Sequence, residues 1–96
     1  MNYLHYEFDA GPEDVIQVTL DKAANVQLMD SANYENYRRH ADFHYHGGYV
    51  KVSPYQLVPP AYGHWHIVID LGGQPGTVRA SAKLLPHIAR ALVSNG

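Results

Sequence analysis

The stretch GHWHIVIDL, residues 63–71, decides the class of fold that this chain adopts. Its side chains alternate in kind, with large apolar residues at every second position, namely Trp65, Ile67, Ile69 and Leu71. Because successive side chains of a β-strand point to opposite faces, this period of two predicts a strand whose apolar set enters the core. The remaining positions are predicted to face away from that core, and they hold His64, His66, Val68 and Asp70.

The same alternation recurs along most of the chain. Further strands are predicted in NYLHYEF (2–8), DVIQVTL (14–20), NVQLMD (25–30), DFHYH (42–46), YVKVS (49–53), PYQLV (54–58) and TVRASAKLL (77–85), with a break at Gly47-Gly48. Turn-forming Gly, Pro and Asp residues separate them at intervals of roughly ten residues. About seven short strands with little helix between them predict an all-β domain, either an antiparallel β-sandwich or a small barrel.

One segment, DSANYENYRRH, begins at Asp30 and interrupts the strand pattern. Asp30 or Ser31 suits the N-cap position of a helix. Tyr34 and Tyr37 are three residues apart, so one helical turn would place them side by side. These features predict a short helix near residues 31–39.

The composition fits one compact domain. Ninety-six residues, of which 46% are hydrophobic, predict a single domain over residues 1–96, and its last stretch, HIARALV (87–93), fits either a short helical tail or a loosely docked segment. No apolar run approaches the roughly 18 residues of a membrane helix, and no secretory signal pattern is present, so we expect a cytoplasmic protein. The absence of cysteine excludes disulfide frameworks and cysteine-ligated zinc. A formal net charge of −2 offers no broad attraction to nucleic acid or to a membrane, so neither is an expected partner.

Two His-x-His pairs carry the clearest chemical signal, His44 with His46 and His64 with His66. In each pair the apolar neighbours have the opposite parity, so all four imidazoles are predicted on faces away from the main core. If the two strands were neighbours, facing side chains would have Cβ atoms about 4.5–5.5 Å apart. Zinc could then bridge the pairs through bonds of about 2.0–2.1 Å. A further ligand could come from His40, Asp42 or Asp70.

Two other interpretations of these histidines stay open. One is a solvated sheet face on which the imidazoles bond to Tyr hydroxyls and backbone groups, without any cofactor. The other is a pH response, since clustered imidazoles repel one another when charged, which lowers their pKa values. The sequence contains neither the HExxH zinc signature nor the G-x-S-x-G nucleophile elbow. No catalytic residue is therefore predicted, and the protein is expected not to be an enzyme.

Tyrosine is unusually frequent, with eight Tyr against two Phe. A buried Tyr must satisfy its hydroxyl, whereas an exposed amphipathic ring suits recognition of a partner. The tyrosines in the middle of the chain could therefore form a secondary core under the helical segment, or a recognition surface for a protein, a glycan or a small ligand. The predicted surface consists of Tyr34, Tyr37, Tyr45, Tyr49, His64 and His66. We expect a non-enzymatic binding or sensing module, with a His-rich metal-binding protein as the alternative; an edge strand such as residues 49–52 could also support a homodimer.

Several motifs in a fixed order make the chain similar to a known family. They are Asp-Ser-x-Asn-Tyr at 30–34, Ser53-Pro54, and Gly63-His64-Trp65-His66 leading into IDLGG. On these residues the chain resembles DUF1883, a bacterial domain family of unknown function whose members are sometimes attached to TIR signalling domains. The resemblance covers most of the length and implies a small β-sandwich, with no catalytic residue or cofactor to carry over. The sequence departs from the family pattern at His44 and His46, where Tyr or other residues are more usual.

Overall fold

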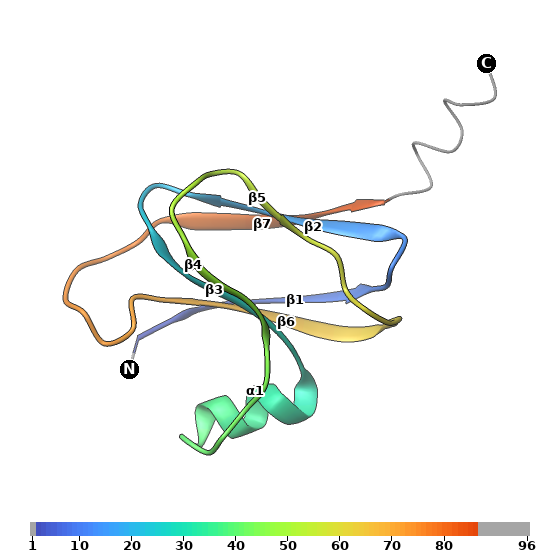
Figure 1. Ribbon diagram of the computed structural model, residues 1–96, viewed down its shortest axis with the longest axis horizontal. Coiled ribbons are helices and arrows are strands. Elements are labelled where there is room, and N and C mark those ends of the chain that lie inside the picture. Colours follow the sequence, from blue (N-terminus) through green and yellow to red (C-terminus); the bar gives the residue numbers. More distant parts are fainter. Residues whose placement is uncertain (1, 87–96) are drawn as a thin grey trace.

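The computed structural model describes residues 2–86 of the chain. Within this range, seven β-strands form two antiparallel sheets, and one helix, α1 (Ser31–Arg38), lies against one of them (Figure 1). The predicted all-β fold and its single short helix are therefore confirmed. The helical tail predicted after Pro86 lies outside the described residues. No helix in residues 2–86 has both the length and the apolar character needed to cross a membrane.

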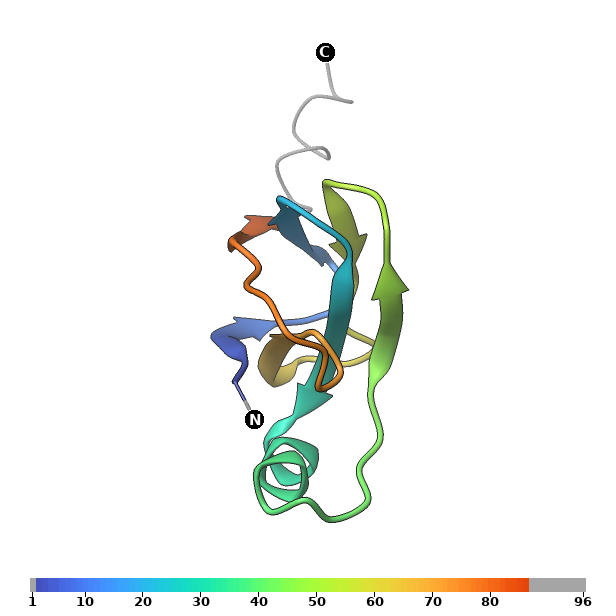
Figure 2. The ribbon, with the colours of Figure 1, turned by 90° about the vertical axis from the view of Figure 1, so that its left-hand side faces the viewer.

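The two sheets stack as a β-sandwich. The larger sheet contains, in order across the sheet, β1 (Leu4–Ala10), β6 (Gly63–Asp70), β3 (Ala24–Asp30) and β4 (His46–Val50). The smaller sheet contains, in order, β5 (Tyr55–Leu57), β2 (Asp14–Leu20) and β7 (Ala80–Pro86). The side view in Figure 2 shows α1 on the far side of the larger sheet from the smaller one. The larger sheet is thus the middle layer of the molecule.

Hydrophobic side chains fill the space between the sheets. Trp65, Ile67 and Ile69 of β6 are buried there together with Ile16 and Val18 of β2. Burying a side chain of this size stabilises the fold by about 1.5–3 kcal/mol relative to leaving it exposed. The apolar set predicted from the alternation in residues 63–71 therefore does face the core.

The opposite face of β6 is buried as well, beneath α1. Val68 packs there against Met29 of β3 and Tyr37 of α1. The reason is that α1 begins directly after β3 and folds back onto the larger sheet, where it contacts β3 and β6. His66 therefore faces away from the sandwich core, as predicted, but α1 covers it instead of solvent, and its side chain is only 6% exposed.

Both local and tertiary contacts hold α1 in place. The Asp30 carboxylate caps the helix by accepting a hydrogen bond of 2.9 Å from the backbone N–H of Asn33. Glu35 and Arg38 form an exposed ion pair with an N–O distance of 2.9 Å. On the buried face, the Tyr37 hydroxyl donates a hydrogen bond of 2.7 Å to Asp70 of β6. The helix predicted near residues 31–39 is confirmed.

Strand β4 departs from the prediction in two ways. Gly47 and Gly48 lie inside it, so the predicted break at these residues is wrong. Gly47 has a φ of +121°, and a Cβ at this position would clash with the carbonyl oxygen of Val26, so close approach of β3 requires glycine. Residues 41–45 are irregular, and the chain enters β4 only at His46, so the strand predicted over 42–46 starts too early.

Candidate functional site

The two His-x-His pairs do not converge. His64 and His66 lie on the outer face of the larger sheet, the face that carries α1. His46 is the cross-strand partner of Leu28, so it lies on the opposite face, and its ring centroid is 6.3 Å from that of Trp65. His44 is exposed in the irregular segment before β4. The predicted four-histidine zinc site is therefore not formed, because strand pairing places His46 on the sandwich side.

Strand pairing instead brings β1 residues to the second His-x-His pair. Glu7 is the cross-strand partner of His66, and Asp9 is the partner of His64. His5 lies one alternation further along the same face of β1, and its Nε2 is 2.8 Å from His66 Nδ1. With two residues from α1, these side chains form a histidine–tyrosine cluster that consists of His5, Glu7, Ser31, Tyr34, His64 and His66.

A continuous chain of hydrogen bonds connects His5 and His66 to residues of α1. His66 Nε2 lies 2.9 Å from Ser31 Oγ, and His5 Nδ1 lies 3.1 Å from Tyr34 Oη. The Tyr34 hydroxyl is also 3.1 Å from the Tyr3 hydroxyl. The Tyr34 ring stacks on both imidazoles, with centroid distances of 4.1 Å to His5 and 4.4 Å to His66. Both ring nitrogens of His5 and of His66 are thus engaged, and residues of α1 contact both rings.

The open half of the cluster is acidic. Glu7 Oε1 lies 2.8 Å from His64 Nε2 and 4.0 Å from His66 Nδ1, and the Glu7 side chain is 51% exposed. Asp9 Oδ1 lies 2.7 Å from the other ring nitrogen of His64. The cluster is therefore buried at His66, half-buried at His5 and Tyr34, and reaches solvent at Glu7, His64 and Ser31.

The surroundings separate the histidines into two protonation classes. Burial lowers the pKa of His5, and burial together with the charge of His5 lowers the pKa of His66. Hydrogen bonds to Glu7 and Asp9 instead raise the pKa of His64. Burial and the hydrogen bond with Tyr3 raise the pKa of Tyr34 to about 12. The lowered pKa values of His5 and His66 favour their neutral forms, whereas the raised pKa of His64 favours its charged form.

Three ligand atoms of the cluster are close enough to hold one metal ion. One ligand atom each of His5, Glu7 and His66 lies within 4.8 Å of the other two. Among residues 2–86, these three residues are the group of His, Asp and Glu side chains whose ligand atoms lie this close together. The His-x-His spacing predicts His66 as a ligand but not His5 or Glu7. Their spacing on one face of NYLHYEF was visible, but the pairing of β1 with β6 was not.

Asp70, predicted as a further zinc ligand, is a structural anchor. Its Oδ1 accepts hydrogen bonds from Asn25 and from the backbone of Gly72, and its Oδ2 accepts from Gln27 and Tyr37. Burial raises the pKa of this carboxyl, but the four hydrogen bonds outweigh burial and hold the pKa below its usual value. The tyrosines of the predicted surface do not form one surface. Tyr37 is buried beside Asp70, and Tyr34 is part of the histidine–tyrosine cluster. Tyr45 and Tyr49 are 47% and 63% exposed.

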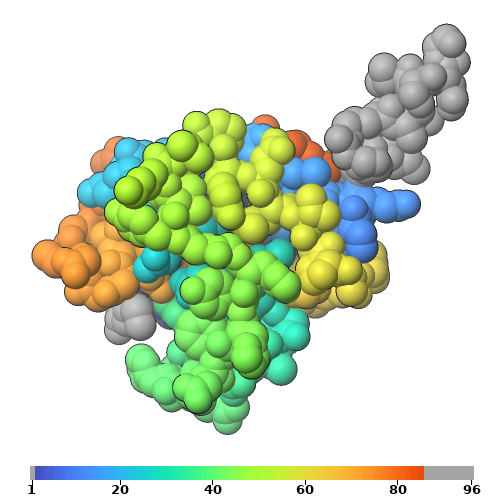
Figure 3. Space-filling view, in the orientation of Figure 1, coloured from blue at the N-terminus to red at the C-terminus, as the bar shows by residue number. Residues whose placement is uncertain are grey.

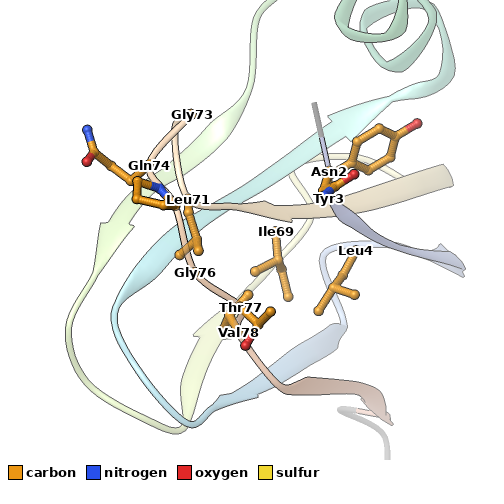
Figure 4. Close-up of a pocket in the computed structure, with 11 residues that line it drawn as sticks. Asn2, Tyr3, Leu4, Ile69, Leu71, Gly73, Gln74, Gly76, Thr77 and Val78 are labelled. Carbon is orange, nitrogen blue, oxygen red and sulfur yellow. The ribbon is translucent and has the colours of Figure 1, made fainter.

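A separate cavity of about 470 Å³ opens at one end of the sandwich. Figure 4 shows Leu4 and Ile69 pointing toward Thr77 and Val78 of the loop that connects β6 to β7. Its lining contains no charged side chain, and consists of Asn2, Tyr3, Leu4, Ile69, Leu71, Gly73, Gln74, Pro75, Gly76, Thr77 and Val78. This cavity suits a small uncharged molecule, and it has fewer directed polar groups than the histidine–tyrosine cluster.

Comparison with known proteins agrees with the resemblance carried by the sequence motifs. The family model for the domain of unknown function DUF1883 matches residues 1–88 of the chain. A search of curated proteins and a search of solved structures found no match. With 88 of 96 residues matched, the chain belongs to the DUF1883 family.

Proposed function

We propose that this domain is a non-enzymatic binding or sensing module whose ligand-contacting region is the histidine–tyrosine cluster. The observation that carries the proposal is the convergence of His5, Glu7 and His66, whose ligand atoms lie within 4.8 Å of one another. Each of these side chains projects from a paired strand, and sites on regular elements hold their geometry better than sites on loops.

The cluster combines a fixed interior with an open entrance. Ser31 and Tyr34 hold the outer nitrogens of His66 and His5, so the ring orientations are set before any ligand arrives. Glu7 is half exposed and gives a ligand access from solvent. A ligand bound between the strands would therefore meet groups already positioned for it.

A sensing role is supported by the position of α1. Two residues of this helix, Ser31 and Tyr34, bond directly to the two buried imidazoles. A ligand that moves or polarises either imidazole must change these hydrogen bonds. Occupancy of the cluster is thereby coupled to how α1 sits on the larger sheet.

The test is a two-dimensional NMR titration of the full chain with a panel of divalent metal ions, phosphate and carboxylate anions, and small aromatic compounds. We expect at least one class to shift the amide signals of residues 5–7, 31–34 and 64–66 together. The shifts should disappear in Glu7→Gln and His66→Gln and persist in His46→Gln, which changes an exposed imidazole outside the cluster. Shifts confined to the cavity residues 71–78, or none with any compound, would refute the proposal.

The exposed tyrosines favour a second candidate function, recognition of a protein partner along β4. This strand lies at an edge of the larger sheet. Tyr45 directly precedes it, and Tyr49 lies within it. The Lys51 ammonium group lies 6.0 Å from the centre of the Tyr49 ring. The space-filling view shows the green segment around residues 40–50 lying open across the face of the molecule (Figure 3).

The partner would add a strand beside β4, and a second copy of the chain is the simplest such partner. Light scattering at increasing concentration should then show a dimer, and Tyr49→Lys should return it to monomer. A wild-type monomer at all concentrations would remove the homodimer, and an unaltered dimer in Tyr49→Lys would place its interface elsewhere.

A further inference from the structure

We propose that the ligand of the histidine–tyrosine cluster is a divalent first-row transition-metal ion such as zinc, bound by His5 Nε2, His66 Nδ1 and Glu7 Oε1. This inference rests on the proposed function, because it names the ligand of the same cluster. This ligand set differs from the four-histidine set that the sequence alone predicted. The two sets have His66 in common, and His5 and Glu7 are new.

The distances fit a site that closes around an ion with small side-chain movements. Two ligands on zinc with bonds of about 2.0–2.1 Å in tetrahedral geometry stand roughly 3.3 Å apart. The His5 Nε2–His66 Nδ1 distance is 2.8 Å and the His66 Nδ1–Glu7 Oε1 distance is 4.0 Å, so the two values lie on either side of this separation. The imidazole pair would open slightly and the carboxylate would approach, with the strands in place.

The protons of the two imidazoles fit a metal between them. In the structure the His5–His66 hydrogen bond requires one proton between the facing nitrogens. On binding, the His5 proton resides on Nδ1 and is donated to Tyr34 Oη, while the His66 proton resides on Nε2 and is donated to Ser31 Oγ. Both facing nitrogens then present lone pairs to the ion, and the metal replaces the shared hydrogen without net loss of an imidazole proton.

The hydroxyl groups of α1 supply the supporting contacts that metal-bound imidazoles need. Metal-ligating histidines almost always donate their other ring N–H to a fixed acceptor. The Tyr34 hydroxyl, while accepting a hydrogen bond from His5, can donate its own hydrogen bond to the Tyr3 hydroxyl oxygen at 3.1 Å. Metal binding therefore keeps the hydroxyl groups of Ser31, Tyr34 and Tyr3 engaged in hydrogen bonds.

Charge and ligand type select the class of ion. The carboxylates of Glu7, Asp9 and Asp30 lie around the site. Arg38 and the protonatable His64 oppose them, and the balance of charge favours a positive ligand. Two imidazoles with one carboxylate suit zinc, iron, cobalt, nickel or copper, whereas calcium and magnesium prefer oxygen ligands. His64 Nε2, which lies 2.8 Å from Glu7 Oε1, is placed to become a fourth ligand or to orient the carboxylate.

Isothermal titration of the untagged full chain with Zn²⁺ tests the inference, together with Co²⁺ absorption as a report of ligand geometry. We expect saturable binding of a single ion per chain and visible Co²⁺ bands of a four- or five-coordinate nitrogen–oxygen site. His5→Gln and Glu7→Gln should abolish or greatly weaken binding, and Ser31→Ala, which removes a supporting contact, should weaken it by about 10–100-fold. His44→Gln and His46→Gln serve as matched controls and should leave the affinity unchanged.

Several results would overturn the inference, and one of them separates it from the proposed function. Zinc binding that survives His5→Gln and Glu7→Gln but disappears in His44→Gln would move the site to the other pair. No saturable Zn²⁺ or Co²⁺ binding by a chain whose circular dichroism shows it folded would end the metal proposal. If another compound of the panel still shifted residues 5–7 and 31–34, the proposed binding function would stand without the metal. If nothing shifted them, both would fall.

Discussion

The contact between Tyr37 and Asp70 gives the most direct test of how the larger sheet holds α1. Tyr37 is buried, and its hydroxyl donates a hydrogen bond of 2.7 Å to Asp70 Oδ2. Substitution of Tyr37 by Phe removes this donor and keeps the ring that packs on Met29 and Val68. The change therefore separates the polar contact between the Tyr37 hydroxyl and Asp70 from the hydrophobic packing of the same side chain.

The structure sets the expected magnitude. Among residues 2–86, the Gln27 amide, at 3.0 Å, is the remaining donor to Asp70 Oδ2 after Tyr37→Phe. A hydrogen bond to a charged group contributes about 1.5–3 kcal/mol to stability, and we expect the free energy of unfolding to fall by that amount. For a domain of this size, each kcal/mol corresponds to about 4–8 °C, so Tm should fall by roughly 6–24 °C.

Urea unfolding followed by circular dichroism at pH 7 measures this loss. Tyr45→Phe is the matched control, because Tyr45 is 47% exposed and its substitution should change stability by less than about 0.5 kcal/mol. A Tyr37→Phe variant as stable as the wild-type chain would refute the reasoning. In that case the remaining hydrogen bonds to Asp70 would suffice, and α1 would be held by packing alone.

Three further predictions follow from single positions. Gly47→Ala should destabilise the chain by about 1–3 kcal/mol in urea unfolding, because φ at Gly47 is +121° and the new Cβ would meet the Val26 carbonyl oxygen. Gly48→Ala is the matched control, since Gly48 has open space around it, and its cost should be well under half of that. Equal losses of stability in the two variants would contradict the backbone argument. Because the pKa of Asp70 is lowered in the folded state, its ionised form stabilises the fold above the usual carboxyl pKa of about 3.9, and this stabilisation should be lost as the pH falls toward the lower folded value. The free energy of unfolding, measured between pH 7 and 3, should therefore depend less on pH in Asp70→Asn than in the wild-type chain. Identical slopes would exclude this role for Asp70. Val68→Ala should lower the free energy of unfolding by about 1.5–3 kcal/mol in thermal unfolding, because Val68 is fully buried beneath α1. Val58→Ala is the control and should change Tm little, since the Val58 residue is 53% exposed. A neutral Val68→Ala would mean that α1 packs only loosely on the larger sheet.

Local sequence features predicted the strands and the helix with good accuracy. The alternation around Trp65 correctly assigned the core face of β6, because a period of two is a property of the extended backbone itself. The N-cap predicted at Asp30 or Ser31 marks the start of α1, and the structure has Asp30 in that role, because a cap is made within three residues. The break predicted at Gly47-Gly48 is wrong, because glycine occurs both in turns and where two strands approach closely. The contact with the Val26 carbonyl oxygen, which identifies the second case, is visible only in the structure.

The candidate site was predicted in part. His64 and His66 were identified from their spacing, and both belong to the histidine–tyrosine cluster. His46 was assigned to the wrong face, because its parity was counted from Phe43 through residues that are not in a strand. His5 was not recognised, because it is 61 residues from His66 in sequence and meets it only through the pairing of β1 with β6.

The amino-acid sequence by itself determined an all-β chain, the side chains that enter the sandwich and the position of its helix, since each depends on neighbours a few residues apart. The tertiary structure alone decided that α1 covers His66, that Glu7 and His5 stand beside it, and that His46 lies on the other face of the sheet. The physical reason is that strand order and register are set by the packing of distant segments, and a shift of one residue moves a side chain to the opposite face.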